Sequence, residues 1–234
     1  MTLIINLNCK EGIVMASDSQ AVALSSNSVP IKYDIQKIYK IGKHTLFGAS
    51  GAISLIQRTE EILQSFKTEF DKGLTTELRE RIKNELFPIL KKASEDHKNY
   101  HHSTDGMPTI NILISTMDSN RSYRTWHIAK DCNDEFLEKV GYTASGNGDL
   151  FAYTLLKNYT PKQLELKKGV LVAYRVMKDA IAVSAFGLSE PIDIWTLKDG
   201  KVENLDKAQI TALNERYLDW KIKEAEVLNL QMPV

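Results

Sequence analysis

The apolar positions at the start of the chain form two short runs with a polar turn between them. Leu3–Leu7 and Ile13–Ala16 flank Lys10-Glu11-Gly12, and both runs are rich in β-branched residues. Such runs on either side of a short turn that ends in glycine predict a β-hairpin. Folding back at this turn brings Asp18 to the same end of the hairpin as Thr2.

Farther along, the apolar pattern alternates between strand and helix periods. Period-two blocks predict strands at 35–41, 45–49, 109–117, 123–128, 136–143, 192–197 and 201–204. Spacings of three and four predict helices at 53–66, 74–100, 149–159, 161–184 and 206–230. We expect Pro88 to kink or break the second helix, and the polar residues 24–30 to form a surface loop. This order of elements predicts an α+β fold, a four-layer α-β-β-α sandwich of two antiparallel sheets.

No internal repeat or low-complexity linker divides the sequence. Residues 1–234 are therefore predicted to form a single domain, with a C-terminal helical extension at about 206–230. In that extension Leu213, Tyr217, Trp220 and Val227 form an apolar stripe that Glu224 interrupts. The stripe packs on its own domain, which we favour, or forms a subunit contact.

Composition excludes some classes of partner. Lys+Arg and Asp+Glu number 30 each, so the net charge is zero and nothing marks a nucleic-acid-binding protein. No apolar run has transmembrane length and no secretory signal precedes the first strand, so a cytoplasmic protein without a membrane partner is expected. Cys9 and Cys132 lack metal-ligand spacing and are expected to be free thiols.

Thr2 is the first candidate for chemistry. Methionine before a small residue is normally removed during synthesis, and removal of Met1 would leave Thr2 with a free α-amine beside its own hydroxyl. An amine with an ordinary pKa of about 7.7–8.0 can act as the base that a hydroxyl nucleophile needs. From these residues alone, an ordinary N-terminal strand in which Asp18 only ends a hairpin is the simpler interpretation.

A family resemblance changes that balance. Thr2 followed by Gly12–Ala21 is similar to the N-terminus of proteasome β-subunits and their simpler bacterial homologue, which are N-terminal-nucleophile (Ntn) hydrolases. The blocks Gln36–Ile41, Gly48–Ala52 and Gly146–Tyr153 also resemble this family, in the same order. The resemblance covers about residues 2–200. It implies the four-layer Ntn-hydrolase sandwich and a threonine peptidase without metal or organic cofactor.

The resemblance also implies roles for particular residues. Thr2 would be the nucleophile, with Asp18 and a buried Lys37 beside it; a buried ammonium would lower the pKa of the amine. Lys32 and Lys40 are alternatives to Lys37, which is otherwise an ordinary edge lysine. The turn before the helix at 53–66 would supply an oxyanion hole from the N–H of Ser50 or Gly51, and Asn147 would hydrogen-bond the terminal amine.

Two of these positions depart from the family. Ser50 stands where β-subunits usually carry a second glycine, and Asn147 stands where they carry a serine. The family's distal aspartate and serine have no assigned equivalent; Asp179, Ser184 and Ser189 are candidates. His97 and His101 have a spacing that could bind a metal on a helix, but a solvated helix end is the favoured interpretation.

Three functions remain open from the sequence. The first is a threonine endopeptidase acting on peptides or proteins inside a homo-oligomeric ring, with an ATP-dependent unfoldase as a candidate partner. The second is an Ntn amidase or acyl-transfer enzyme that is not a general protease. The third is a non-catalytic structural subunit of a proteasome-like ring.

Overall fold

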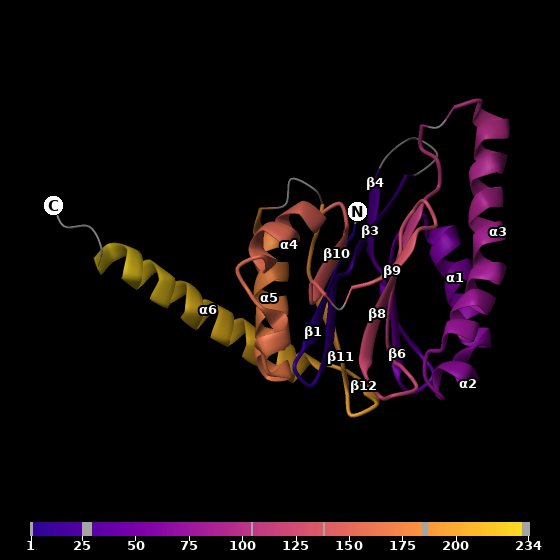
Figure 1. Cartoon of the computed structure of the whole chain (residues 1–234). Helices are drawn as coiled ribbons and strands as arrows, with labels where there is room; N and C mark the ends of the chain where they lie inside the picture. The colour runs from indigo at the N-terminus through magenta and orange to yellow at the C-terminus, as the bar shows by residue number, and fades with distance from the viewer. Residues whose placement is uncertain (1, 25–29, 104, 138, 184–186, 231–234) are drawn as a thin grey trace.

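The computed structural model of the chain describes residues 2–24, 30–103, 105–137, 139–183 and 187–230. Two five-stranded antiparallel sheets lie face to face, and helices cover the outer face of each sheet (Figure 1). The layers follow the order helix, sheet, sheet, helix. This arrangement confirms the predicted α+β, four-layer α-β-β-α sandwich.

The first sheet is built on the N-terminal hairpin. Its strands, in spatial order, are β10 (Tyr142–Gly146), β1 (Leu3–Cys9), β2 (Gly12–Asp18), β11 (Ile192–Lys198) and β12 (Lys201–Asn204). The helices on its outer side are α4 (Asp149–Leu156), α5 (Leu166–Ala182) and α6 (Lys207–Leu230), and a short 3-10 helix, η1 (Pro161–Gln163), precedes α5. The turn between β11 and β12 confirms the predicted hairpin, because Asp199 and Gly200 have φ of 50° and 70°, as a two-residue hairpin turn requires.

The second sheet carries the other helices. Its strands, in spatial order, are β5 (Ile38–Ile41), β6 (Thr45–Gly51), β7 (Ile110–Met117), β8 (Tyr123–Ile128) and β9 (Asp134–Phe136). The outer face is covered by α1 (Ile53–Ser65), α2 (Lys67–Phe70) and α3 (Thr76–His101). Helix α3 begins two residues later than the predicted start at 74, because the Thr75 side chain caps it by accepting a hydrogen bond from the N–H of Leu78 at 3.1 Å.

A small third sheet was not predicted. It pairs β3 (Gln20–Leu24) with β4 (Pro30–Asp34) in an antiparallel hairpin. The predicted surface loop lies between these strands, but residues 25–29 are outside the described part of the chain.

The strand predicted at 136–143 is wrong. Its two ends belong to different sheets, β9 in the second and β10 in the first, and the chain crosses the sandwich between them. Gly141, with φ of +84°, lies just before β10. Its N–H donates to the carbonyl of Leu137 and its carbonyl accepts from the N–H of Asn8 on β1, so the connection is fixed by one local bond and one bond to the first sheet.

The helix predicted at 161–184 is shorter than expected and begins later. Leu164 is extended, with φ of −85° and ψ of 137°, between η1 and α5. Its carbonyl accepts a hydrogen bond from the N–H of Lys10 at 2.9 Å, which ties this segment to the turn of the first hairpin. Helix α5 therefore starts at Leu166 and ends at Ala182.

Helix α3 continues through Pro88, so the predicted break does not occur. Proline removes one intrahelical hydrogen bond, the one to the carbonyl of Asn84. Ile82, Leu86 and Leu90 are buried on the same helix, and their burial against the second sheet outweighs that loss.

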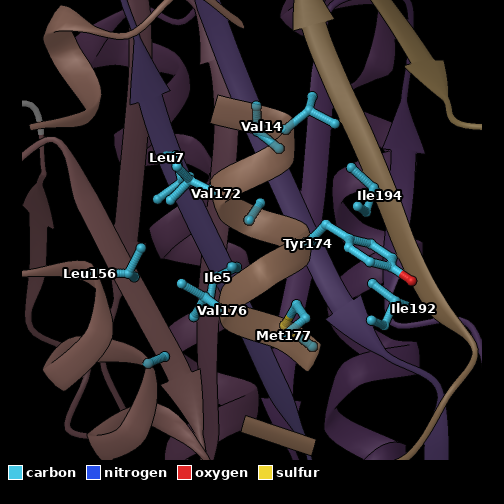
Figure 2. Packing of buried hydrophobic residues seen from close by; sticks show 14 of the residues in the cluster. Ile5, Leu7, Val14, Leu156, Val172, Tyr174, Val176, Met177, Ile192 and Ile194 are labelled. Carbon is cyan, nitrogen blue, oxygen red and sulfur yellow. The ribbon is translucent and has the colours of Figure 1, made fainter. Parts of the chain in front are cut away.

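The outer core of the first sheet lies under α5. This helix packs on β1 and β2 and also contacts α4 and α6, so it is buried from more than one side, as predicted. Figure 2 shows Val172 and Val176 beside Leu7 and Ile5. Gly169 lets the helix approach the sheet closely, because a Cβ at this position would overlap the Sγ of Cys9.

A polar network lies between the two sheets. The Asn6 side-chain amide donates to the hydroxyl of Thr125 at 2.9 Å and to the side-chain Oδ1 of Asn8 at 3.1 Å. Ser115 donates to the Asn6 oxygen at 2.7 Å, and Thr125 donates to the Asn8 oxygen at 2.7 Å. Because buried polar groups are costly when unpaired, this network fixes how β1 sits over β7 and β8.

Helix α6 packs on α5 through the predicted stripe. Leu213 and Tyr217 are buried, and Glu224, which interrupts the stripe, forms an ion pair with Arg175 of α5. The favoured prediction, packing on the same chain, is thus confirmed up to Glu224. On the other face Leu218 and Ile222 are 51% and 58% exposed, and the end of the helix extends beyond the α4–α5 layer (Figure 1).

The close approach at Gly169 gives a stability prediction. Gly169→Ala should lower the free energy of unfolding by about 1–3 kcal/mol, because an overpacked contact displaces α5 from the sheet. Denaturant unfolding measures the change. Cys9→Ala removes the sulfur that the new methyl group would meet, so the double variant should recover most of the loss; a double variant no better than Gly169→Ala would show that the clash lies elsewhere.

Candidate active site

The register of the first hairpin brings Thr2 and Asp18 together. Ile4 of β1 is opposite Ser17 of β2. The chain before Ile4, which includes Thr2, therefore meets Asp18 at one end of the hairpin. The carboxylate of Asp18 accepts a hydrogen bond from the N–H of Leu3 at 2.8 Å. The carboxylate is therefore held one residue away from Thr2, as the sequence predicts.

Lys37 forms a buried ion pair with Asp18. Its Nζ is 2.7 Å from Asp18 Oδ1 and also donates to the carbonyl of Gln20 at 2.6 Å. The two side chains are 6% and 0% exposed. Lys37 lies just before β5 rather than within that strand, where the sequence had placed it.

The alternatives to Lys37 do not occupy this place. Lys40 lies on β5 and is exposed. The side chain of Lys32 is outside the described part of the structure.

The electrostatics of Lys37 reflect two opposed effects. Burial lowers its pKa below the ordinary value, while the charge of Asp18 and the hydrogen bond to it act in the opposite direction. The carboxylate is held by further bonds, since Asp18 Oδ2 accepts from the N–H of Gln20 at 3.2 Å. The pairing with Asp18 thus favours the ammonium form of Lys37, against the burial that disfavours it.

An open pocket of about 550 Å³ contains this group. Thr2, Lys37, Ser50, Gly51, Gly146 and Asn147 all line it. Thus all the residues predicted to line the site from the sequence lie around one pocket, with Asp18 buried behind Lys37. Apolar and aromatic side chains complete the wall, among them Ala49, Tyr39, Ile53 and Ile56.

Glycines allow backbone segments to meet at this pocket. A Cβ on Gly146 would overlap the carbonyl of Thr2, and the residue has φ of +107°. A Cβ on Gly51, with φ of +137°, would overlap the carbonyl of Thr109. Only glycine fits both positions without rearrangement of the backbone.

The end of β6 also presents a backbone donor. The N–H of Ala52 donates to the carbonyl of Thr109 at 2.9 Å, on the side of β7. Successive N–H groups of a strand point to alternate sides, so the N–H of Gly51 points away from β7. Pairing between β5 and β6 ends at Gly48, which leaves that side open toward the pocket.

A hydrogen bond joins the two sheets beside Gly51 and Gly146. The sequence did not predict it. The hydroxyl groups of Ser50 and Ser145 are 2.6 Å apart and both residues are buried. Ser50 precedes Gly51, and Ser145 precedes Gly146. The departure of Ser50 from the family pattern was the available signal, but only the tertiary structure reveals its partner.

Of the other described candidates, none lines the pocket, although the carbonyl of Ser189 accepts a hydrogen bond from the N–H of Ser19, next to Asp18, at 3.4 Å. Asp179 accepts from the Tyr217 hydroxyl at 2.7 Å in the α5–α6 contact. Ser189 donates to the carbonyl of Glu190 at 3.0 Å, and Ser184 is outside the described residues. His97 bonds the carbonyl of Asp105 at 2.9 Å, and within the described part of the chain no three His, Cys, Asp or Glu side chains cluster as metal ligands.

Asn147 lines the pocket as an exposed residue. Its predicted bond to the terminal amine stays a prediction. Cys9 and Cys132 are both free thiols, as expected, and burial raises the pKa of Cys9 to about 12.

Comparison with known families agrees with this geometry. The family model described as "Proteasome subunit" matches residues 2–190, most of the chain. The chain belongs to the proteasome subunit family. The relatives include a proteasome subunit beta of Nanoarchaeum equitans, 26% identical over 206 residues, which covers 88% of this chain and 97% of the relative.

Two further matches extend the comparison. Proteasome subunit beta 1 of Thermococcus onnurineus is 21% identical over 213 residues, covering 91% of this chain and 96% of the relative. Among solved structures, Anbu (ancestral beta-subunit) from Yersinia bercovieri superposes with a TM-score of 0.73 at 14% identity, over 99% of this chain and 98% of that one. The resemblance to proteasome β-subunits, and the fold it implied, are therefore confirmed. Across the described residues no helix is long and apolar enough to cross a membrane.

The Ser50–Ser145 bond gives a prediction for the site. Ser50→Ala and Ser145→Ala should each lower the free energy of unfolding by about 1–3 kcal/mol, because each leaves one buried hydroxyl unpaired. The double variant, which removes both hydroxyl groups, should be less destabilised than the sum of the two. Denaturant unfolding of all four proteins gives the coupling energy; strictly additive losses would mean that the two hydroxyls do not depend on each other.

Proposed function

We propose that this protein is a threonine-type N-terminal-nucleophile hydrolase that cleaves amide bonds of peptides or proteins. The observation that carries the proposal is the buried Asp18–Lys37 pair at the base of the pocket that Thr2 lines. A charged pair is costly to bury without a role for the charge. Beside a hydroxyl nucleophile, the positive charge of the ammonium can lower the pKa of the neighbouring amine that acts as base.

The proposed mechanism uses groups of this chain. After removal of Met1, the α-amine of Thr2 accepts the proton of its own hydroxyl, and the hydroxyl oxygen attacks the carbonyl carbon of the substrate. The positive charge of Lys37 lowers the pKa of the amine and keeps it in its proton-accepting form. Asp18 holds the ammonium in place.

The N–H of Gly51 would stabilise the oxyanion that forms in this attack. It points away from β7 on the side where β5 pairing has ended, and such a donor contributes several kcal/mol to many acyl-transfer reactions. The intermediate then collapses to an ester on Thr2 with loss of the amine product. Water hydrolyses the ester and restores the free hydroxyl.

The oligomeric state is part of the proposal. We propose a homo-oligomeric ring that encloses the sites in the cytoplasm and receives unfolded protein, with an ATP-dependent unfoldase as its partner. Membership of the proteasome subunit family supports it. A stand-alone amidase or acyl-transfer enzyme would use the same Thr2 chemistry on a smaller substrate.

The first functional prediction concerns the nucleophile. Thr2→Ala should abolish hydrolysis of fluorogenic peptides, because the attacking oxygen is lost, while Thr2→Ser should retain measurable activity. A β-lactone or epoxyketone probe should label the wild-type protein on its first residue, as peptide mass spectrometry would show. Intact mass establishes whether Met1 has been removed in each preparation. Undiminished turnover by processed Thr2→Ala, or a label elsewhere, would contradict the mechanism.

The second functional prediction concerns pH. The acidic limb of kcat/KM against pH should report protonation of the Thr2 amine. Lys37→Met removes a neighbouring positive charge and leaves Asp18 negative, so the amine pKa should rise and the limb should move to higher pH. Activity at neutral pH should fall at least tenfold, and a pH profile of the variant measures both changes.

Stability must be followed beside this assay. Loss of one partner of a buried pair costs about 3–5 kcal/mol, so melting curves should accompany the Lys37→Met and Asp18→Asn profiles. Lys40→Met, a neighbouring exposed lysine, is the matched control and should leave the limb in place. A folded Lys37→Met protein with an unchanged limb would rule out the proposed role of Lys37.

A further inference from the structure

A second depression lies next to the active-site pocket, between α3 and the strand ends of the second sheet. It has a volume of about 830 Å³. Its floor is apolar and consists of Leu55, Phe87, Leu90 and Ile110, from α1, α3 and β7. None of the predicted site residues lines this cleft, and the proposed mechanism assigns it no role.

Lysines dominate the rim of the cleft. Lys83, Lys91, Lys98 and Lys130 line it, against only two carboxylates, Glu95 and Asp131. Lys83 is paired with Glu80 and Asp134 at 3.1 Å each, and Lys91 is 3.7 Å from Glu95.

Two of these lysines differ from the others in their pairing, and the charge of Lys130 acts on the neighbouring Asp131 carboxylate. Among the residues that the structure describes, Lys98 and Lys130 form no ion pair. The backbone of Lys130 is fixed by two hydrogen bonds. Its own N–H donates to the side chain of Asn111 at 3.2 Å, and the N–H of Ala129 donates to the carbonyl of Asn133 at 2.8 Å across the turn that contains Lys130. Four lysines and two carboxylates therefore line the rim above the apolar floor, and Lys98 has a charge that no ion pair among the described residues offsets.

The wall of the cleft also contains a free backbone acceptor. Pro88 has no N–H, so the carbonyl of Asn84 lacks its intrahelical donor, and both residues line the cleft. A carbonyl without its helical donor can accept a hydrogen bond from an N–H of a bound peptide.

The cleft is continuous with the active-site pocket. Thr109 and Lys130 line both depressions. Gly51 of the pocket is directly opposite Ile110 of the cleft floor in the β6–β7 ladder. A chain that passes Thr109 and Lys130 can therefore reach the cleft from the pocket.

We propose that this cleft binds an acidic segment of the substrate chain that also carries apolar side chains, several residues from the bond cleaved at Thr2. The proposal rests on the proposed function and specifies the substrate class of the same site. Apolar side chains of the segment fill the floor, its carboxylates meet Lys98 and Lys130, and a backbone N–H donates to the carbonyl of Asn84. Because the charges are exposed at the rim, binding weakens as salt concentration rises.

Direct binding tests the proposal without hydrolysis. Fluorescence anisotropy of the Thr2→Ala protein would be measured with a labelled peptide that carries leucine and glutamate in its distal part, and with a matched peptide in which glutamine replaces glutamate. The acidic peptide should bind at least tenfold more tightly at low salt. Equal affinity for the two peptides would overturn the proposal.

Two lysines of the same helix provide matched variants. Lys98→Glu reverses a charge on the rim and should weaken binding of the acidic peptide at least fivefold. Lys92→Glu makes the same change at an exposed position that does not line the cleft, and affinity should stay within twofold. An equal loss in both variants would mean that general charge, not the cleft, binds the peptide.

Protection of Cys132 from alkylation tests where the peptide binds. Its thiol lines the cleft and is partly buried, whereas Cys9, the other cysteine, is buried under α5. The acidic peptide should slow alkylation of Cys132 by iodoacetamide at least threefold at alkaline pH, and the glutamine peptide should not. Unchanged alkylation in the presence of saturating acidic peptide would place the binding site elsewhere.

Hydrolysis by the wild-type protein separates this proposal from the proposed function. An acidic distal extension should lower KM with little change in kcat, because the cleft contacts the chain away from the reacting bond. Cleavage without any acidic preference would overturn the cleft proposal alone. Acidic binding by Thr2→Ala with no cleavage by processed wild type would overturn the proposed function alone.

Discussion

The buried carboxylate of Asp18 is the contact on which the site depends. It accepts hydrogen bonds from the N–H groups of Leu3 and Gln20 and pairs with the ammonium of Lys37. Three segments are thereby fixed relative to one another: the start of β1, the start of β3 and the residues before β5. A buried ion pair gives little net stability compared with apolar residues of the same size. Its value here is geometric, since it sets where the chain beside Thr2 must lie.

The opposite wall depends on close approach rather than charge. Gly51 and Gly146 each occupy a place where a Cβ would overlap a neighbouring backbone carbonyl, and the Ser50–Ser145 bond joins the residues just before them. These contacts connect one sheet to the other at the edge of the pocket. With the Asn6–Thr125 network deeper in the sandwich, they limit sliding between the sheets. The position of the Gly51 N–H relative to Thr2 is thus set by the packing of the whole sandwich.

Much of this arrangement could be predicted from local pattern. The first hairpin follows from two β-branched runs and a glycine turn, and its register places Asp18 beside Thr2 because strand pairing is strictly periodic. The sandwich follows from the order of strands and helices. The prediction of Lys37 required the family resemblance, since periodicity alone does not distinguish a buried lysine from an exposed one such as Lys40.

The errors share a physical cause, because they depend on contacts distant in sequence. The residues from 136 to 143 have a strand-like pattern, but alternation does not say which sheet each end joins. The late start of α5 is set by the bond of Leu164 to Lys10, more than one hundred and fifty residues earlier in the chain. Pro88 is tolerated because Ile82, Leu86 and Leu90 of α3 are buried against the second sheet. The partner of Ser50, and the shared position of Lys130 beside pocket and cleft, appear only once the sheets are packed.

Fold and chemistry make different demands on the sequence. The sandwich superposes on Anbu with a TM-score of 0.73 at only 14% identity, so most of its side chains can be replaced while the layers are kept. A non-catalytic ring subunit would need those layers, but it would not need a lysine and an aspartate buried at the base of an open pocket. The argument for hydrolysis therefore depends on Thr2, Asp18 and Lys37 and the pocket around them, rather than on the sandwich that carries them.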